Sequence, residues 1–173
     1  MLPISVCIIS YNEEDKITRC LQSVNWADEI ILVDSGSTDK TIALCKQHTS
    51  KICHRDWTGY VDQKNYALSL AKNDWVLSLD ADEEVSPELQ QEIKHVLQSD
   101  SIQYAGFKIP RLTYYLGKWI YHSGWYPDYQ IRLFQKSCAQ WTGSILHERV
   151  QLDGKLDSLH ASLYHYPPPE WST

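Results

Sequence analysis

WVLSLDADEE, residues 75–84, is the stretch that decides the fold of this 173-residue chain. Its first half is an apolar run, which is typical of a strand buried on both faces of a sheet. Asp80 and Asp82 follow at the carboxyl end of that strand, where open α/β sheets bind their ligands. Two carboxylates one residue apart repel each other unless a cation lies between them, and oxygen ligands at this spacing suit Mg²⁺ or Mn²⁺. The stretch therefore predicts a metal site at the end of a buried strand.

Three other interpretations of the acidic motif were weighed. An EF-hand loop starting at Asp80 would need glycine and glutamate where Val85 and Gln91 stand, so it is excluded. A phosphatase-type Asp-x-Asp usually continues into Gly-Thr, whereas Glu83 and Glu84 follow here. A solvated acidic turn that caps the next helix is the usual explanation of an isolated motif. The motifs elsewhere in the chain decide against it.

The first hundred residues alternate between strand and helix patterns. Apolar, β-branched runs predict strands at 4–10, 30–33 and 51–53, before the strand that carries the acidic motif. Helices are expected from Tyr11–Glu14 onward, over 39–48, over 60–72 and from Ser86-Pro87-Glu88 onward. Ser37 or Thr38 is expected to cap the second helix, and Ala67, Leu70 and Ala71 are expected to face inward from the third. This alternation predicts a parallel sheet with right-handed crossovers.

The second half of the chain is aromatic and strand-like. Strands are expected at 104–109 and 130–134, with seven tryptophans and eleven tyrosines in the whole chain. Such rings usually pack in a core or on a sheet, and they also suit carbohydrate, whose C–H faces stack on aromatic rings. We therefore expect an α/β fold with a mostly parallel sheet flanked by helices and a smaller mixed or antiparallel region in the second half.

Composition excludes several classes of protein. The formal charge of −6 argues against a nucleic-acid surface, and no apolar run approaches the ~20 residues of a membrane span. The N-terminus has no basic region before its first strand, so a signal peptide is not expected. The five cysteines are scattered without a Cys-x-x-Cys pair, which indicates a reducing cytoplasm and no zinc site.

Several motifs together resemble a known family. Three of them resemble the family 2 glycosyltransferases of GT-A (Rossmann-like) fold: Ser10–Glu14, Val33–Asp39 and Leu79–Glu83. Four more resemble the bacterial lipopolysaccharide-core glucosyltransferases: Gln63-Lys64-Asn65, Gly124–Asp128, Gln130–Phe134 and His147-Glu148. The resemblance runs from residue 4 to about 166. It implies one glycosyltransferase domain over 1–173, with a nucleotide-sugar-binding half at 1–100 and an acceptor-side half at 101–173.

One departure from the family is the length of the chain. Relatives usually continue with further helices, whereas this chain stops soon after Pro169. We therefore expect either a fragment or a minimal form. A missing acceptor-side or membrane-facing segment could leave it inactive.

The resemblance also implies residues that bind the donor. Tyr11 and Glu13 match the family's base-stacking and ribose-binding residues, and Lys64 is expected to meet the diphosphate. Asp34 matches the carboxylate that accepts a hydrogen bond from uracil N3–H. Two alternatives stay open, namely that Asp34 is a loop-capping aspartate and that Lys64 is a solvated helix lysine. Asp80 is expected to hold the ribose or a metal-bound water.

The metal ligands and the catalytic carboxylate follow from the same resemblance. Asp82, with Asp80, is expected to bind Mg²⁺ or Mn²⁺. A lone histidine is usually structural, but His165 lies where a late histidine completes the metal shell in some GT-A enzymes. Glu148 is the expected general base and Asp128 the residue that orients the acceptor. A salt bridge to the neighbouring Arg149 would weaken Glu148 as a base, and either carboxylate could instead be a structural ion pair.

The resemblance implies a cytoplasmic, metal-dependent, inverting glycosyltransferase. Its expected donor is a UDP-sugar, with glucose as the implied sugar, and its expected acceptor is a lipopolysaccharide inner-core sugar or another glycan. At most a peripheral association with the inner face of the membrane is expected. One alternative is a sugar nucleotidyltransferase, which would want a Gly-rich, basic loop where Ser10–Glu13 stands. The other is a truncated nucleotide-sugar-binding module without turnover.

Overall fold

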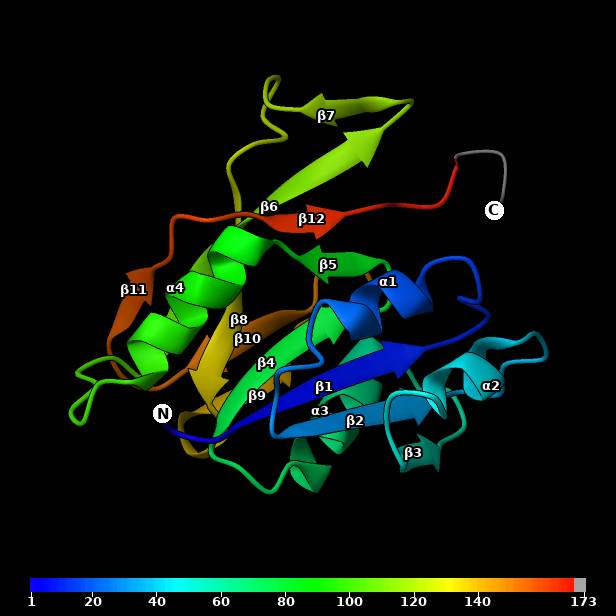
Figure 1. Ribbon diagram of the computed structural model, residues 1–173, viewed down its shortest axis with the longest axis horizontal. Helices are drawn as coiled ribbons and strands as arrows, with labels where there is room; N and C mark the ends of the chain where they lie inside the picture. Colours follow the sequence, from blue (N-terminus) through cyan, green and yellow to red (C-terminus); the bar gives the residue numbers. More distant parts are fainter. Residues whose placement is uncertain (170–173) are drawn as a thin grey trace.

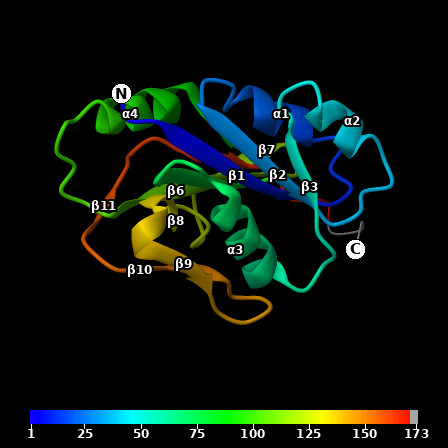
Figure 2. The same cartoon turned by 90° about the horizontal axis from the view of Figure 1, so that it is seen from below.

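The computed structural model describes residues 1–169, which form a central sheet covered on both faces. Helices α1 (Ile17–Gln22), α2 (Thr41–Cys45) and α4 (Pro87–Leu97) cover one face. Helix α3 (Tyr60–Leu70) and a two-stranded ribbon cover the other, as Figure 2 shows. The hydrophobic core is correspondingly divided into two clusters, one on each face of the sheet.

The first half of the chain builds the parallel part of the sheet. Its strands are β1 (Ile4–Ser10), β2 (Glu29–Asp34), β3 (Lys51–His54) and β4 (Trp75–Asp80), in the order β3-β2-β1-β4. All three pairings between them are parallel. The strands at 4–10, 30–33, 51–53 and 75–80 were predicted from their apolar runs, and the prediction is confirmed.

The second half extends the same sheet with mixed pairings. Strand β8 (Asp128–Gln135) lies antiparallel to β4, and β6 (Gly106–Tyr115) lies antiparallel to β8. Next comes β12 (Leu163–His165), parallel to β6, and then β5 (Glu83–Val85), antiparallel to β12. Four shorter strands complete the fold: β7 (Lys118–Ile120) and β11 (Leu156–Ser158) beside β6, and the ribbon of β9 (Ala139–Thr142) and β10 (Arg149–Leu152). The expected α/β fold with a mixed second half is confirmed.

The ends of the helices differ in part from the sequence prediction. Ser86 caps α4 as expected, because its side chain accepts a hydrogen bond from the amide of Leu89. Helix α1 begins only at Ile17, since the preceding residues form a turn in which the carbonyl of Glu13 accepts from the amide of Ile17. The predicted apolar face of Ile17, Cys20, Leu21 and Val24 is buried, although Val24 lies just beyond the end of the helix.

Two predictions about helices were wrong. Neither Ser37 nor Thr38 caps α2, because the hydroxyl of Ser37 donates to Asp34 instead. Lys40 occupies the N-cap position without a side-chain capping bond, and the carboxylate of Asp39, one residue earlier, accepts a hydrogen bond from the amide of Thr41 at 2.9 Å. Leu70 is 37% exposed rather than inward, because α3 ends at this residue and presents Ala67 and Leu68 to the core.

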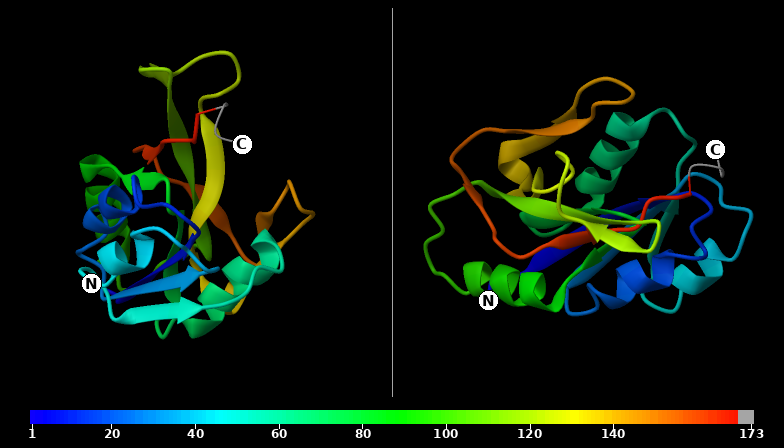
Figure 3. Two further views of the ribbon diagram at one scale, coloured as in Figure 1. Left: turned by 90° about the vertical axis from the view of Figure 1, so that its right-hand side faces the viewer. Right: turned by 90° about the horizontal axis from the view of Figure 1, so that it is seen from above.

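A hairpin of β6 and β7 projects from the body of the molecule (Figures 1 and 3). Aromatic rings pack against one another at its base, with the ring centroids of Trp119 and Tyr164 4.6 Å apart and those of Tyr114 and Trp119 5.1 Å apart. Here the aromatic density serves sheet packing, one of the two expected uses. Within residues 1–169, no helix combines the length and apolar character that crossing a bilayer requires.

Candidate active site

A cavity of about 930 Å³ opens at the carboxyl ends of β1 and β4. Tyr11 and Glu13 line it from the loop after β1, and Asp80 and Asp82 line it from the acidic turn after β4. The opposite wall consists of residues 57–60 and Ile145. Four residues predicted to form the site thus share one cavity, at the edge of the sheet where α/β proteins bind ligands.

Both carboxylate oxygens of Asp80 face cations. Lys64 Nζ lies 3.2 Å from one oxygen and an Arg132 guanidinium nitrogen lies 3.3 Å from the other. Burial alone would raise the pKa of Asp80, but the charges of Arg132 and Lys64 outweigh it and hold the pKa well below its ordinary value. Asp80 is therefore a carboxylate that two protein cations already neutralise, whereas Asp82 is not paired with either of them.

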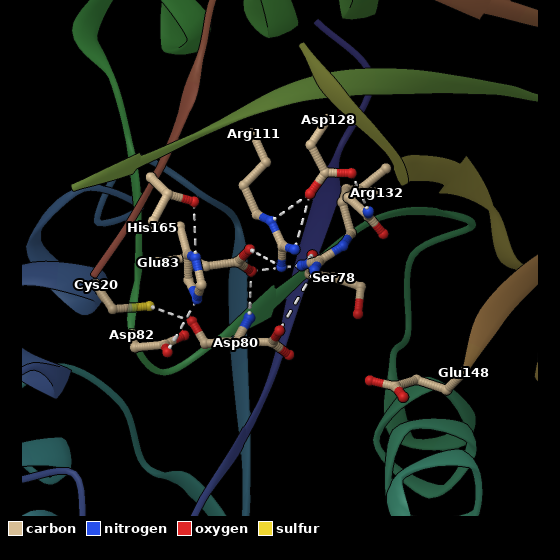
Figure 4. Close-up of polar contacts among 12 residues, drawn as sticks. Cys20, Ser78, Asp80, Asp82, Glu83, Arg111, Asp128, Arg132, Glu148 and His165 are labelled. Atoms are coloured by element: carbon tan, nitrogen blue, oxygen red, sulfur yellow. Dashed lines mark hydrogen bonds and ion pairs between the residues drawn. The ribbon is translucent and has the colours of Figure 1, made fainter. Parts of the chain in front are cut away.

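A buried ion-pair chain continues from Asp80 toward the second half of the molecule (Figure 4). Arg132, only 3% exposed, lies 2.5 Å from the carboxylate of Glu83. Arg111 lies 3.8 Å from the other oxygen of Glu83 and 2.8 Å from Asp128. Sequence reasoning missed Glu83, Arg111 and Arg132. The available signal was a charged residue, Arg132, inside the otherwise apolar run of β8.

Asp128 is tied into this chain by three hydrogen bonds. Arg111 donates two of them to one carboxylate oxygen, at 3.1 and 2.8 Å, and Gln130 donates to the other at 2.9 Å. The arrangement matches the structural ion pair that was considered as an alternative for Asp128. Its role in orienting an acceptor stays a prediction.

Asp82 and His165 converge at the edge of the cavity. His165 Nε2 lies 3.3 Å from an Asp82 carboxylate oxygen, and its Nδ1 lies 3.2 Å from the hydroxyl of Thr113 (Figure 4). The pairing of β12 with β5 brings His165 to this place, and the amide of Tyr166 donates to the carbonyl of Asp82 at 2.9 Å. Of the predicted ligands, Asp82 and His165 thus lie together, although they are far apart in sequence.

This pair fits Mg²⁺ or Mn²⁺ in one particular way. Among residues 1–169, no group of three or more His, Cys, Asp or Glu side chains is arranged to hold a metal ion. Mg²⁺, however, is usually bound by one or two protein carboxylates together with substrate phosphates rather than by an all-protein cage. A contact from the second ring nitrogen, such as that of His165 with Thr113, is common for metal-binding histidines. The donor set suits an ion that arrives with a phosphate ligand.

Glu13 carries an unusual proton affinity. Burial and the nearby charge of Asp82 raise the pKa of Glu13 to about 7. In the unfolded chain the same carboxyl has its ordinary pKa of 4.5. The folded protein therefore binds an extra proton at Glu13 between these two pH values, and the stability that this proton supplies is lost as the pH rises toward 7.

Glu13→Gln is expected to stabilise the metal-free protein at pH 8 but not at pH 4.5. At pH 8 the wild-type carboxylate repels Asp82, whereas glutamine is neutral like the protonated acid. Because Glu13 is partly exposed and solvent screens its charge, we expect a rise in Tm of only about 2–4 °C. Thermal unfolding in a chelating buffer at both pH values measures the effect. The same Tm difference at pH 4.5 and pH 8 would contradict it.

Asp34 is buried and bonded within its own loop. One carboxylate oxygen accepts from the hydroxyls of Ser10 and Ser37, at 2.7 and 2.6 Å. The other accepts from the amides of Gly36 and Ser37, at 2.9 and 2.7 Å. Burial opposes ionisation, but these hydrogen bonds outweigh it and lower the pKa of Asp34. The geometry is that of the loop-capping aspartate left open as an alternative, and a contact with uracil stays a prediction.

Three successive residues of α3 form hydrogen bonds or ion pairs with three different segments of the site. Gln63 donates to the carbonyl of Arg55, in the loop that enters the cavity wall, at 3.1 Å. Lys64 reaches both Asp80 and Glu148, at 3.2 and 3.3 Å. Asn65 donates to the carbonyl of Trp141 and accepts from its amide, at 2.9 and 2.8 Å. Residues 63–65 therefore connect α3 to three segments around the cavity. Lys64 is buried and ion-paired, so it is not a solvated lysine.

Glu148 follows a tight turn at residues 143–147. Gly143 has a φ of +114°, and a Cβ there would lie 2.2 Å from the carbonyl oxygen of His147, so the turn requires glycine. Glu148 pairs with Lys64 rather than with Arg149, the neighbour considered from sequence. His147 contributes its amide to the turn, through a hydrogen bond of 3.1 Å to the carbonyl of Ser144.

Comparison with known proteins identifies relatives of the whole described region. A sequence model of glycosyl transferase family 2 matches residues 5–152. An uncharacterized glycosyltransferase of Rickettsia typhi is 38% identical over 96% of this chain and 61% of its own length. The lipopolysaccharide core biosynthesis glycosyltransferase LpsC of Rhizobium meliloti is 30% identical over 96% of this chain and 64% of its own. The chain thus spans about three fifths of the length of these curated relatives.

Solved structures share the fold at lower identity. S. aureus TarS in complex with UDP-GlcNAc superposes with a TM-score of 0.70 at 17% identity, over 97% of this chain and 59% of that one. Glucosyl-3-phosphoglycerate synthase from Mycobacterium tuberculosis, in complex with Mg²⁺ and UDP, gives a TM-score of 0.50 at 24% identity, over 67% of this chain and 44% of that one. These likenesses establish a GT-A fold.

Proposed function

The chain belongs to glycosyl transferase family 2. On that basis we propose that it transfers a sugar from a UDP-sugar to a glycan acceptor, and we propose glucose as that sugar. One observation carries the proposal. The acidic turn lines a cavity of about 930 Å³, and His165 lies against Asp82 of that turn. Lys64 connects Asp80 in the cavity wall to Glu148. The residues proposed to bind the metal ion and the candidate base, Glu148, are thus connected within one site.

The donor is proposed to bind with its nucleoside toward β1 and its diphosphate toward the acidic turn. Tyr11 is 57% exposed and free to stack on a base, and Glu13 lies beside it for the ribose. Asp82 and His165 would hold the Mg²⁺ or Mn²⁺ ion, with Asp80 beside them. When bound, that ion supplies positive charge that neutralises the leaving diphosphate. Asp34 would contact the uracil only after giving up one of its loop hydrogen bonds.

The transfer itself is proposed to invert the anomeric carbon. The acceptor hydroxyl oxygen forms a bond to that carbon on the face opposite the diphosphate, and the bond between the carbon and the diphosphate oxygen breaks. The proton of the hydroxyl passes to Glu148, and the electron pair leaves with UDP. The ammonium of Lys64 lies 3.3 Å from the carboxylate of Glu148 and 3.2 Å from that of Asp80, which lines the cavity.

For the acceptor we propose an inner-core sugar of lipopolysaccharide. The name of the Rhizobium meliloti relative supports this choice, and the aromatic second half suits a carbohydrate. The cytoplasm is the proposed location, because all five cysteines have free thiols and nucleotide sugars are the substrates. Any association with the membrane would be peripheral. The division into a donor half and an acceptor half stays a prediction, and residues 170–173 of the second half lie outside the described part.

UDP with Mn²⁺ is expected to raise the Tm of the wild-type protein by about 5–10 °C at 100 times its dissociation constant, which corresponds to ~2.7 kcal/mol. Asp82→Asn is expected to abolish the dependence on Mn²⁺, because an amide supplies no anionic oxygen for the ion. Thermal shift and calorimetry with UDP, with and without Mn²⁺, measure both effects.

The matched control is Asp74→Asn, an aspartate on the opposite end of β4 that pairs with Ser137. Unchanged UDP affinity in Asp82→Asn, together with no metal dependence in the wild type, would contradict the metal site. Equal competition by CDP, GDP and UDP would show that no uracil-specific contact exists. Binding of UDP without transfer to any acceptor would favour the binding module, and formation of UDP-glucose from UTP and glucose 1-phosphate would favour the nucleotidyltransferase.

A further inference from the structure

We propose that Lys64 is a positioning residue that holds Glu148 at the cavity, so that one buried ammonium connects the acidic donor side with the base on the acceptor side. The inference rests on the proposed function, because it assigns Glu148 the role of base. It differs from the expectation that Lys64 serves the donor diphosphate.

The ammonium of Lys64 is already committed within the protein. The residue is 4% exposed, with its Nζ 3.2 Å from Asp80, 3.3 Å from Glu148 and 4.2 Å from the centroid of the Trp141 ring. A buried ammonium requires charge partners, and here two carboxylates and an aromatic face provide them. Asp80 has a second cation in Arg132, whereas within the described chain Lys64 is the cation with which Glu148 pairs.

The turn before Glu148 is held by its own backbone hydrogen bond, from the amide of His147 to the carbonyl of Ser144. Ile145 and Leu146, just before Glu148, are 82% and 80% exposed, so hydrophobic packing does not fix the turn. The preceding strand is fixed, because Asn65 bonds both the amide and the carbonyl of Trp141. The backbone on both sides of Glu148 is therefore held, by Asn65 at Trp141 and by the pairing of Arg149 with Thr142. The ion pair with Lys64 is what fixes the carboxylate at the end of the Glu148 side chain.

Removal of the ammonium should release Glu148 from the donor side. In Lys64→Met the two carboxylates lose their shared cation, and their repulsion favours movement of the exposed turn away from Asp80. We expect kcat for transfer to fall about 10²-fold, as a displacement of about 1 Å can produce. The affinity for UDP with Mn²⁺ should change less than about threefold, since Asp82 and His165 are untouched. Lys64→Arg, which keeps the charge, should recover part of kcat.

A double-mutant cycle separates the two roles of Lys64. The assay measures transfer from UDP-glucose to a deacylated inner-core oligosaccharide by Lys64→Met, Glu148→Gln and the double variant. If Lys64 acts through Glu148, the double variant is no slower than Glu148→Gln alone. If Lys64 serves the diphosphate, the losses multiply and UDP affinity falls more than tenfold in Lys64→Met, which would overturn the proposal.

Hydrogen exchange provides a readout that needs no turnover. Amides of residues 143–149 should exchange faster in Lys64→Met than in the wild type, while those of β1 and β4 should not change. The matched control is Lys94→Met, a helix lysine whose Nζ lies 5.5 Å from the Trp26 ring on the far side of the sheet. Unchanged protection of 143–149 in Lys64→Met would overturn the proposal. A wild type that neither binds UDP nor transfers glucose would contradict the proposed function, and hydrogen exchange would still test the attachment of Glu148.

Discussion

Glu148→Gln should bind UDP-sugar like the wild type and lose about 10²–10⁴-fold in turnover, the usual contribution of a general base. Glutamine has nearly the same shape and can still accept a hydrogen bond from Lys64, but it takes no proton from an acceptor hydroxyl. Binding measured by calorimetry should therefore be unchanged, while kcat for transfer to the inner-core oligosaccharide collapses.

Asp128→Asn is the matched comparison for that variant. Its carboxylate already accepts three hydrogen bonds from Arg111 and Gln130, so we expect a smaller loss of turnover than in Glu148→Gln. If Glu148→Gln turned over like the wild type while Asp128→Asn was inactive, the roles of the two carboxylates would have to be exchanged.

Arg132→Met is expected to destabilise the fold by about 3–5 kcal/mol, because it leaves buried carboxylates without their cation. Glu83 is 1% exposed and lies 2.5 Å from Arg132, and Asp80 loses one of its two cations. The charges of Glu83 and Asp80 outweigh the effect of burial and raise the pKa of Arg132, so the guanidinium is always charged. Urea denaturation measures the loss as a lower midpoint at an unchanged m-value.

The double variant Glu83→Gln/Arg132→Met tests the cause of that loss. Once the buried charge at Glu83 is gone, much of the stability should return, which a general packing defect would not allow. Arg111→Met, whose side chain is 23% exposed, should destabilise less than Arg132→Met. A loss below about 1 kcal/mol in Arg132→Met would mean that the buried ion-pair chain contributes little.

The elements of the first half could be predicted because local pattern and final environment agree there. Strand β4 is an apolar run, interrupted only by Ser78 before Asp80, and it is buried on both faces. Ser86-Pro87 begins α4 through a local capping bond. Leu70 is a position at which the local sequence pattern predicted the wrong environment. Its place in the helical pattern suggested burial, but α3 ends there and the core is filled by Ala67 and Leu68.

The sequence allowed many of the residues of the site to be predicted, but not the contacts that they make with one another. Motif resemblance found Asp80, Lys64 and Glu148 separately, whereas their sharing of one ammonium depends on how α3 packs against β1 and β9 and on the turn after β9. Glu83 and Arg132 were missed because each is an ordinary charged residue in sequence, and only the pairing of β4 with β8 makes them neighbours. Local sequence carries no information about such long-range charge partners.

The late strand β12 has a consequence for how the protein is made. Leu163 pairs with Val85 and His165 with Glu83, so the acidic turn is completed by a strand that is synthesised long after it. At translation rates of ~5–20 residues per second, several seconds separate the two strands as they emerge from a ribosome. Until β12 has been synthesised, the acidic turn lacks the strand that pairs with β5 and carries His165. If the donor binds as proposed, UDP should stabilise the chain only once β12 is in place, and we expect no assistance from nucleotide to the folding of the strands made before it.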